Sequence, residues 1–398
     1  MAKLVFMLGL FFTCSQAIAQ EQRTTFTPST GAVPVIPLVQ TKSTEGISRF
    51  INSHYQTPQE KVTAIFYWLT SHIVYDVAAL ANMPLYYEKQ ALISQTLTTR
   101  KAVCQGYAEV FQELCAKTGL RSYLITGFVI PKGTTTPMSH AWAAAQVNGQ
   151  WFLFDPTWGA GVVENGKFIP RVNDRYFMVP PTRMIQTHIP FDPLWQFQSQ
   201  PLSYHAFISA RNSGSAVKAS AAKPKPAFAY LDSLATYAAS SEKGKLTATI
   251  QRMAANPIIP PVVLVHLNAL KKNLVVIRQN ETINLYNGAV TSFNGALDQM
   301  NQFIRYKNNR FLPFKPDLAL QQMLTGITFK LQETKKLLQQ IKPEDNSTLF
   351  LSLQNMKANL EKALVQAQKQ EQFLEMYLKT PVKQRNALFY KQALADRQ

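Results

Sequence analysis

The sequence predicts an α+β domain, with a helix packed on an antiparallel sheet, followed by an all-α helical bundle. Two observations support this prediction. Apolar residues recur at helical spacing up to about residue 119, and strand-like patterning replaces it over residues 121–155. From about residue 228 onward, long amphipathic stretches dominate the chain. Consecutive strands that follow a helix are typical of an α+β fold, and repeated long helices are typical of a bundle.

The first 19 residues have the pattern of a secretory signal peptide. Lys3 gives a positive start, residues 4–12 are apolar, and Ala17-Ile18-Ala19 fits a small-residue cleavage site. The apolar run is too short to cross a bilayer, and we expect no transmembrane segment later in the chain. We therefore expect residues 1–19 to be removed and the protein to be exported, to a periplasm or to the extracellular space.

The α+β domain is expected over residues 20–210, and its helices have clear start signals. Thr57-Pro58-Gln59-Glu60 supplies a capping residue, a proline at the first helical position and a glutamate three residues after the cap. A second helix is expected to begin at Cys104 and to end at Gly119, because a glycine commonly follows the last helical turn. Between them, these helices would cover one face of the sheet.

The sheet is predicted from three strand-like segments. Residues 121–130 are strand-like, residues 139–147 are predicted to form a second strand, and residues 150–155 form the return strand. Asn148-Gly149 separates the last two segments, and this dipeptide is a strong signal for a two-residue hairpin turn. The strands are therefore expected to pair in antiparallel fashion.

A linker and a helical bundle are expected after the α+β domain. Residues 211–227 are rich in Ser, Ala, Lys and Pro and cannot bury enough apolar surface to fold alone. Residues 228–398 contain apolar positions spaced three and four apart, which predicts long amphipathic helices in an antiparallel bundle.

The charge distribution favours some partners and excludes others. The formal net charge is +18, and most of the basic excess lies after residue 220. The basic residues are scattered and accompany no nucleic-acid motif, so no specific nucleic-acid partner is expected. An anionic polymer of the cell envelope stays open as a partner of the basic helical domain.

The cysteines point to one candidate nucleophile. After removal of Cys14 with the signal peptide, Cys104 and Cys115 remain. If both lie on one helix, they are about 16 Å apart, whereas a disulfide needs Cα atoms within about 7 Å. Cys115 fits a buried apolar position. A cysteine without a disulfide partner is unusual in an exported protein, and a catalytic role would explain why Cys104 is a free thiol.

Cys104, His140 and Asp155 together can form a thiol nucleophile, its base and an orienting carboxylate. The helix start at Cys104 would favour the thiolate. The Asn148-Gly149 hairpin places His140 and Asp155 within about two residues of register on strands about 4.8 Å apart. Zinc is the rival use of Cys and His, but no pair of ligands stands at short spacing. We therefore expect no metal and no cofactor.

Residues from about 57 to 193 resemble the transglutaminase-like superfamily of papain-type thiol enzymes, and in particular its bacterial and kyphoscoliosis-peptidase-type branch. The matching segments are Phe66-Tyr67-Trp68, Ile73-Val74-Tyr75-Asp76, Val103-Cys104-Gln105-Gly106-Tyr107-Ala108, His140-Ala141-Trp142, residues 151–159, Tyr176-Phe177-Met178-Val179-Pro180-Pro181 and His188-Ile189-Pro190. The resemblance implies that Cys104 is the nucleophile, His140 the general base and acid, and Asp155 its orienter. It also implies acyl transfer through a thioester on a peptide or protein substrate.

Two classes of function remain open at this point. One is an exported acyl-transfer enzyme, in which water as acceptor gives peptide or amide hydrolysis and an amine gives a crosslink. The other is a catalytically silent interaction or scaffold protein of the cell envelope, which the large basic helical domain would suit.

Overall fold

The computed structural model describes residues 34–80, 88–131, 133–216, 228–342 and 347–395. It divides into two compact units, Met1–Tyr230 and Leu231–Gln398. The expected signal peptide lies outside the described residues, and so does the expected linker from residue 217 onward. The first residues of that linker are helical, because helix α8 extends over Tyr204–Ser213.

The first unit begins with the helices that the capping signals predict. Helix α1 spans Thr44–His54 and helix α2 spans Pro58–His72. Thr57 Oγ1 accepts a hydrogen bond from the Glu60 amide, and the Glu60 carboxylate accepts one from the Thr57 amide. These two bonds form a capping box, which satisfies amide donors that the first turn of a helix leaves unpaired. Helix α5 spans Cys104–Lys117, so it begins at Cys104 as predicted.

The central sheet has four antiparallel strands in the order β5-β4-β3-β8. Their bounds are Ser122–Val129 for β3, Met138–Val147 for β4, Gln150–Phe154 for β5 and His188–Pro190 for β8. Asn148 and Gly149 join β4 to β5 with φ of 51° and 82°. Two positive φ angles are what a type I′ hairpin turn requires, so the predicted hairpin is confirmed.

Several elements of the first unit carry no strong local signal, and we did not predict them from the sequence. Helix α4 spans Lys89–Thr99, and a short parallel pair joins β1, Val74–Tyr75, to β2, Lys101–Ala102. The remaining short elements are α3, Val77–Leu80; α6, Pro156–Ala160; β6, Gly161–Glu164; β7, Lys167–Pro170; and α7, Pro181–Met184.

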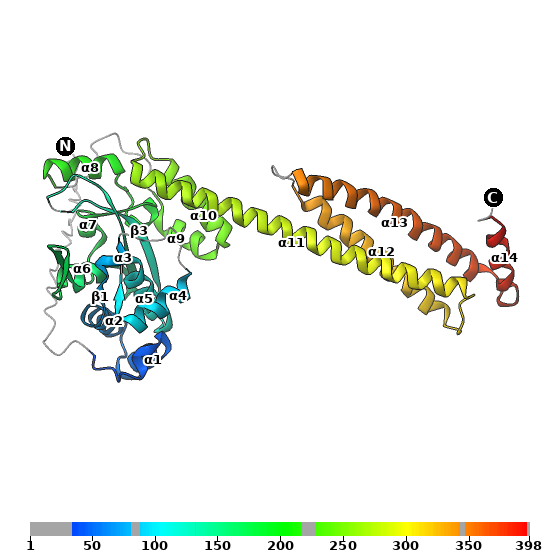
Figure 1. The fold of residues 1–398 in the computed structure, drawn as a ribbon, viewed down its shortest axis with the longest axis horizontal. Helices are drawn as coiled ribbons and strands as arrows, with labels where there is room; N and C mark the ends of the chain where they lie inside the picture. Colours follow the sequence, from blue (N-terminus) through cyan, green and yellow to red (C-terminus); the bar gives the residue numbers. More distant parts are fainter. Residues whose placement is uncertain (1–33, 81–87, 132, 217–227, 343–346, 396–398) are drawn as a thin grey trace, which may run out of the picture. The chain divides into compact units, whose positions relative to one another are not determined.

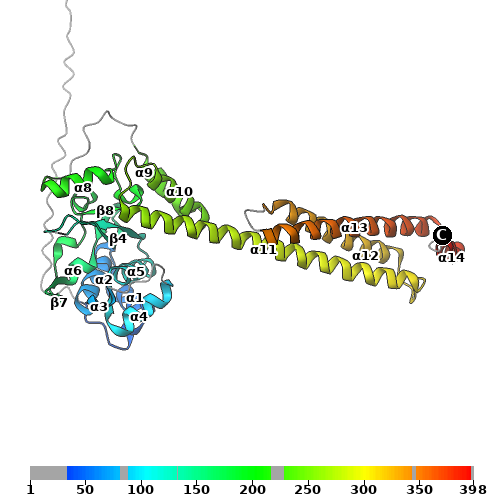
Figure 2. The same ribbon diagram turned by 45° about the horizontal axis from the view of Figure 1, so that its top comes forward.

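One hydrophobic core joins α2 and α5 to the sheet. Phe66 from α2, Phe111 from α5 and Phe154 from β5 are all fully buried in it. The α5 helix lies against β4, where small residues such as Ala143 allow close approach. Figure 1 shows α2 and α5 beside the strands, and Figure 2 shows the same arrangement from a second direction. This packing fixes the N-terminus of α5 relative to the sheet, and therefore fixes Cys104.

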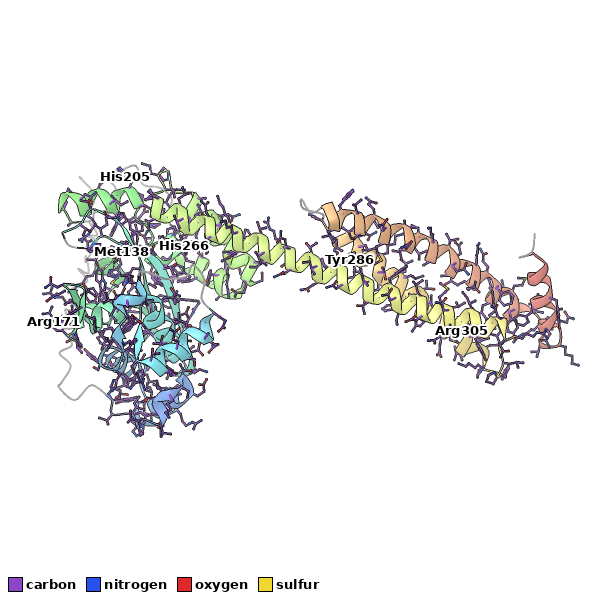
Figure 3. All side chains as sticks on the ribbon, in the orientation of Figure 1. Met138, Arg171, His205, His266, Tyr286 and Arg305 are labelled. Atoms are coloured by element: carbon purple, nitrogen blue, oxygen red, sulfur yellow. The ribbon has the colours of Figure 1, made fainter. Side chains whose placement is uncertain are left out.

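The second unit consists of helices, as predicted. Their bounds are Tyr230–Ala239 for α9, Glu242–Ala254 for α10, Pro261–Asn308 for α11, Asp317–Gln340 for α12, Ser347–Lys379 for α13 and Arg385–Ala395 for α14. Tyr286 and Arg305, both labelled in Figure 3, lie on α11. Helices α11, α12 and α13 lie side by side (Figures 1 and 2).

Helices α11 and α12 run antiparallel. Gly288 of α11 lies beside Leu337, and Gln299, further along α11, lies beside Gly326. Residues that three helices contribute form the core, among them the fully buried Phe303 and Ile327. No helix within the described residues is long and apolar enough to cross a membrane.

Candidate active site

Cys104 is the first residue of α5, and two neighbouring contacts hold this helix start in place. The Asp76 amide donates to the carbonyl of Ala102, which ties the chain just before Cys104 to β1. The Tyr107 hydroxyl donates to the carbonyl of Ile73, at the end of α2. Among the described residues, no side chain caps the N-terminus of α5. Cys104 therefore stands at the positive end of the helix dipole, and such an environment favours an anion.

His140 and Asp155 meet across the β4–β5 hairpin. The Nε2 atom of His140 lies 2.8 Å from Oδ2 of Asp155. The observed register pairs Ala143 with Phe154, so Asp155 stands two residues away from His140, as the hairpin turn predicted. Met138, labelled in Figure 3, starts β4 with 39% of its surface exposed, whereas His140 is buried. The strand therefore runs from the surface at Met138 into the interior at His140, and the imidazole is buried.

Burial lowers the pKa of the His140 imidazole, whereas Asp155 and the Cys104 sulfur raise it, which places the thiol close to this ring. Because Nε2 of that ring is engaged with Asp155, Nδ1 is the nitrogen left to face the sulfur. Cys104 also packs against Ala141, the neighbour of His140 on β4. The structure thus brings together all three residues that the sequence singled out.

Asp155 is also the N-cap of α6, and this second role restricts its orientation. Its Oδ1 atom accepts hydrogen bonds from the amides of Thr157, at 2.9 Å, and Trp158, at 3.1 Å. Pro156 occupies the first helical position, where a missing amide costs nothing. With Oδ1 held by the backbone, Oδ2 points toward the histidines.

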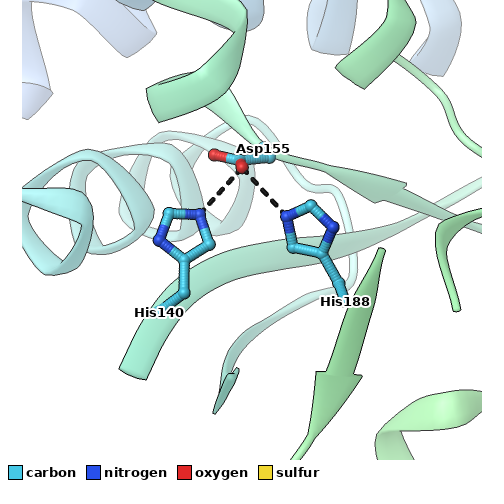
Figure 4. Close-up of side chains that lie close together, drawn as sticks. All are labelled: His140, Asp155 and His188. Atoms are coloured by element: carbon cyan, nitrogen blue, oxygen red, sulfur yellow. Dashed lines mark hydrogen bonds and ion pairs between the residues drawn. The ribbon is translucent and has the colours of Figure 1, made fainter. Parts of the chain in front are cut away.

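His188 is a fourth member of the site, and no sequence motif assigned it a role. Its Nε2 atom lies 3.2 Å from the same Oδ2 atom of Asp155. Figure 4 shows the rings of His140 and His188 both directed at this carboxylate. The only sequence signal was the His188-Ile189-Pro190 segment of the family resemblance. A strand of three residues has too little periodicity to reveal its partner.

The charges of these buried groups depend on one another. Burial alone would lower the pKa of His140, but the Asp155 carboxylate and the Cys104 sulfur outweigh it and raise this pKa above its usual range. Burial alone would raise the pKa of Asp155, but His140 and the hydrogen bond from His188 lower it. In His188 burial dominates, so its pKa is lowered in spite of the carboxylate. The site therefore favours an imidazolium at His140, a carboxylate at Asp155 and a neutral ring at His188.

Two further residues help to define the site. Burial is the main cause that raises the pKa of Tyr75 on β1, and the charges of Cys104 and Asp155 add to it, which places this phenol near the thiol. Cys115 lies near the other end of α5 and is fully buried. Burial alone raises the pKa of its thiol. The two cysteines of α5 thus stand in opposite environments, and only Cys104 lies beside a base.

His140, Asp155 and His188 also satisfy the spacing of a metal-holding group, since one ligand atom from each lies within 4.8 Å of the others. Each of these atoms is engaged in the hydrogen bonds described above. A metal ion would have to displace both N–H donors from Asp155. We therefore interpret the group as a hydrogen-bonded network around one carboxylate.

Cys104, His140 and Asp155 lie together where helices pack on an antiparallel sheet, and this architecture is that of a transglutaminase-like fold. Residues 46–156 match the family described as the Transglutaminase-like superfamily. The first unit of the chain therefore contains a transglutaminase-like domain.

Two curated relatives resemble part of the chain. The Kyphoscoliosis peptidase of Homo sapiens is 32% identical over 180 residues, which cover 42% of this chain and 27% of the relative. The Kyphoscoliosis peptidase of Mus musculus is 34% identical over 157 residues, which cover 37% of this chain and 23% of the relative. The chain thus spans only about a quarter of the length of these relatives. A solved crystal structure of a TGase aligns at 19% identity, over 35% of this chain and 37% of that chain, with a TM-score of 0.25, too low to support an argument.

Proposed function

We propose that this protein is a thiol enzyme that transfers acyl groups through a thioester on Cys104. The observation that carries the proposal is the chain of contacts from Cys104 to His140 and from His140 to Asp155, all buried at the N-terminus of α5. The match to the transglutaminase-like superfamily supports the same chemistry.

The first half-reaction begins from the Cys104 thiolate and the His140 imidazolium, the pair that forms when the thiol proton passes to His140 Nδ1. The sulfur attacks the carbonyl carbon of an amide, a C–S bond forms, and the carbonyl electrons move to the oxygen. Amide groups in the first turn of α5 are placed to stabilise this oxyanion. The intermediate collapses, the C–N bond breaks, and His140 returns its proton to the departing amine.

The second half-reaction releases the acyl group. An acceptor gives its proton to His140 while it attacks the thioester carbon, and the C–S bond then breaks with the electrons returning to sulfur. Water as acceptor gives a carboxylic acid, whereas an amine gives a new amide. We favour water, and so a peptide or protein substrate that is hydrolysed, because the curated relatives are named peptidases.

Two parts of the proposal concern location and partners. The signal-peptide pattern of residues 1–19 supports export to a periplasm or to the extracellular space. The positive net charge supports contact with an anionic envelope polymer.

A scaffold role is the second candidate, and one observation favours it. The second unit has its own hydrophobic core, which α11, α12 and α13 build. A domain of this kind can serve as an interaction module even when Cys104 is idle.

Mass spectrometry of an acyl adduct separates these candidates. The full-length protein is treated with a panel of peptides that carry an electrophilic carbonyl, and the modified residue is located. We expect the adduct on Cys104, with Cys115 as an internal control that stays unmodified because it is fully buried. Cys104→Ala should show no adduct and no hydrolysis. Hydrolysis that persists in Cys104→Ala would overturn the proposal, and a wild-type protein that forms no adduct with any peptide would favour the scaffold.

A further inference from the structure

We propose that His188 is a positioning residue for the thiol chemistry, because it donates the hydrogen bond that completes the environment of Asp155 opposite His140. This inference rests on the proposed function and deepens it. His188 lies on β8, at the other edge of the sheet from β5, which leads into Asp155. Its hydrogen bond to the site goes to Asp155, so it acts through the carboxylate.

The hydrogen bonds around His188 select one form of the ring. The Nδ1 atom lies 2.7 Å from the Thr187 hydroxyl oxygen, and Nε2 faces Asp155. A carboxylate cannot donate, so Nε2 must carry the proton, and in a neutral ring Nδ1 then accepts from Thr187. Because burial lowers the pKa of His188, the ring stays neutral. His188 therefore brings one N–H donor to Asp155 without bringing a positive charge that would compete with the imidazolium of His140.

The Asp155 carboxylate needs this donor because it has no contact with solvent. Its exposed fraction is 0%, so every lone pair must find a partner inside the protein. Two backbone amides donate hydrogen bonds to Oδ1, and His140 donates one to Oδ2. His188 donates a second hydrogen bond to Oδ2. Without it, a buried anion would lack one hydrogen bond, and its hold on the imidazolium of His140 would weaken.

Aromatic packing fixes the position of the His188 ring. Its centroid lies 4.6 Å from that of Trp158 and 5.1 Å from that of Trp142, both in edge-on contacts. Tyr176 lies on a further side at 6.1 Å. A ring held on several sides presents Nε2 in one direction, which is what a positioning role requires.

The strand that carries His188 approaches the sheet closely because its neighbour lacks a side chain. Gly127 of β3 pairs with His140 on one side and with Pro190 on the other. A Cβ atom at Gly127 would lie 2.2 Å from the Ile189 carbonyl oxygen and 2.5 Å from the Trp142 ring. This glycine therefore lets β8 come near enough for His188 to reach a carboxylate that follows β5.

The titratable and charged groups that act on His188 come from several elements. They are Asp155 before α6, His140 on β4, and Arg211 on α8, with Tyr176 of the turn Asp174–Tyr176 in ring contact. Asp155 raises the pKa of His188, whereas His140 and Arg211 lower it. A variant with a neutral side chain that donates an N–H to Asp155 should therefore preserve the function of His188.

Two amide substitutions test the inference, because both side chains end in the same polar group but differ in length. In His188→Gln the side-chain nitrogen can occupy the place of Nε2 and donate to Asp155. In His188→Asn the amide ends near the place of Nδ1 and cannot reach the carboxylate. Ile189→Val, a mild change at the next residue of β8, controls for general disturbance of the strand.

The measurement is the rate at which iodoacetamide alkylates Cys104 in the full-length protein, recorded against pH. We expect His188→Gln and Ile189→Val to behave like the wild type. His188→Asn should react about 10- to 100-fold more slowly, which is the effect of losing one hydrogen bond to a buried charge. The acid limb of its profile should also move to higher pH, because the imidazolium that accompanies the thiolate has lost support. A purely structural defect would lower the amplitude at every pH and leave the midpoint in place.

Wild-type profiles in both amide variants would overturn the inference, and so would equal losses in both variants without a shift of the midpoint. Neither result would touch the proposed function, provided that the wild-type Cys104 forms its acyl adduct. A wild-type Cys104 that forms no adduct would remove the proposed function, and the inference with it.

Discussion

His140 on β4 and Asp155, which directly follows β5, form a 2.8 Å hydrogen bond inside the protein, and one tight turn joins the two strands. The same carboxylate caps α6, so the residue that orients the base is itself fixed by the backbone. Asp155 thus both orients His140 and caps helix α6. A variant that separates the two roles is therefore informative.

Asp155→Asn separates them. Asparagine is a good helix cap, so the bonds to Thr157 and Trp158 can persist. The new NH₂ group faces the N–H groups of His140 and His188, however, and His140 must turn its proton toward Cys104 instead. We expect acylation of Cys104 to fall by about 10³- to 10⁴-fold, measured as the rate of adduct formation. Asp192→Asn is the matched control, because Asp192 also caps a helical turn, Pro193–Gln196, and is also buried. A comparable loss in both variants would contradict a special role for Asp155.

The hairpin and the start of α5 could be predicted from the sequence because both depend on local signals. Asn148-Gly149 determines the turn, and the turn determines the register that brings His140 near Asp155. The place of His188 could not be predicted in this way. Strand β8 pairs with β3 across about sixty residues of chain, and its three residues have no pattern of their own. Helix α4 was not predicted, because its sequence signal is mixed. Its buried positions include Thr96 and Leu97, which stand beside further threonines, and threonine favours strands.

Gly127→Ala should disturb the site from a distance. The added Cβ would collide with the backbone of β8 and with Trp142, so β8 must move outward. We expect lower stability of the first unit and a shift of the Cys104 alkylation profile in the same direction as in His188→Asn. Thermal unfolding and alkylation against pH check both expectations. Gly288→Ala is the control, since its Cβ would make only an ordinary contact of 3.6 Å with Leu337. An unchanged alkylation profile in a destabilised Gly127→Ala protein would separate β8 from the thiol chemistry.

The stability of the first unit should depend on pH through His188. Burial lowers the pKa of this ring in the folded protein below the value of about 6.5 that it has when unfolded. Below that pH the unfolded chain binds a proton that the folded chain does not, so stability falls as the pH falls. His188→Gln removes this titration. Urea unfolding at pH 7.5 and pH 5 should therefore show a smaller acid loss in His188→Gln than in the wild type, and an equal loss would contradict a neutral buried ring.

Removal of metal ions should leave the thiol chemistry intact. The atoms of His140, Asp155 and His188 that could ligate an ion are the atoms that hold the hydrogen-bonded network. We expect protein treated with EDTA and freed of chelator to alkylate and acylate Cys104 at the untreated rate. Added Zn²⁺ at equal concentration to the protein should slow the reaction, because an ion on these atoms displaces the proton that orients His140. Loss of activity with EDTA and recovery with a divalent ion would instead support a metal centre.

Loss of packing in the core of the helical unit should leave the thiol site unchanged. Ile327 on α12 is fully buried in the core that α11, α12 and α13 share. Ile327→Ala should reduce the free energy of unfolding of this unit by about 2–5 kcal/mol, through lost burial and the cavity that remains. Phe329→Ala is the control, because Phe329 is 69% exposed and its removal leaves no cavity. Urea unfolding followed by circular dichroism reports the helices, and alkylation of Cys104 reports the first unit. We expect Ile327→Ala to shift the first signal alone, since the contacts described for Cys104, His140 and Asp155 lie within the first unit. A parallel loss of Cys104 reactivity at low urea would show that the helical unit supports the thiol site.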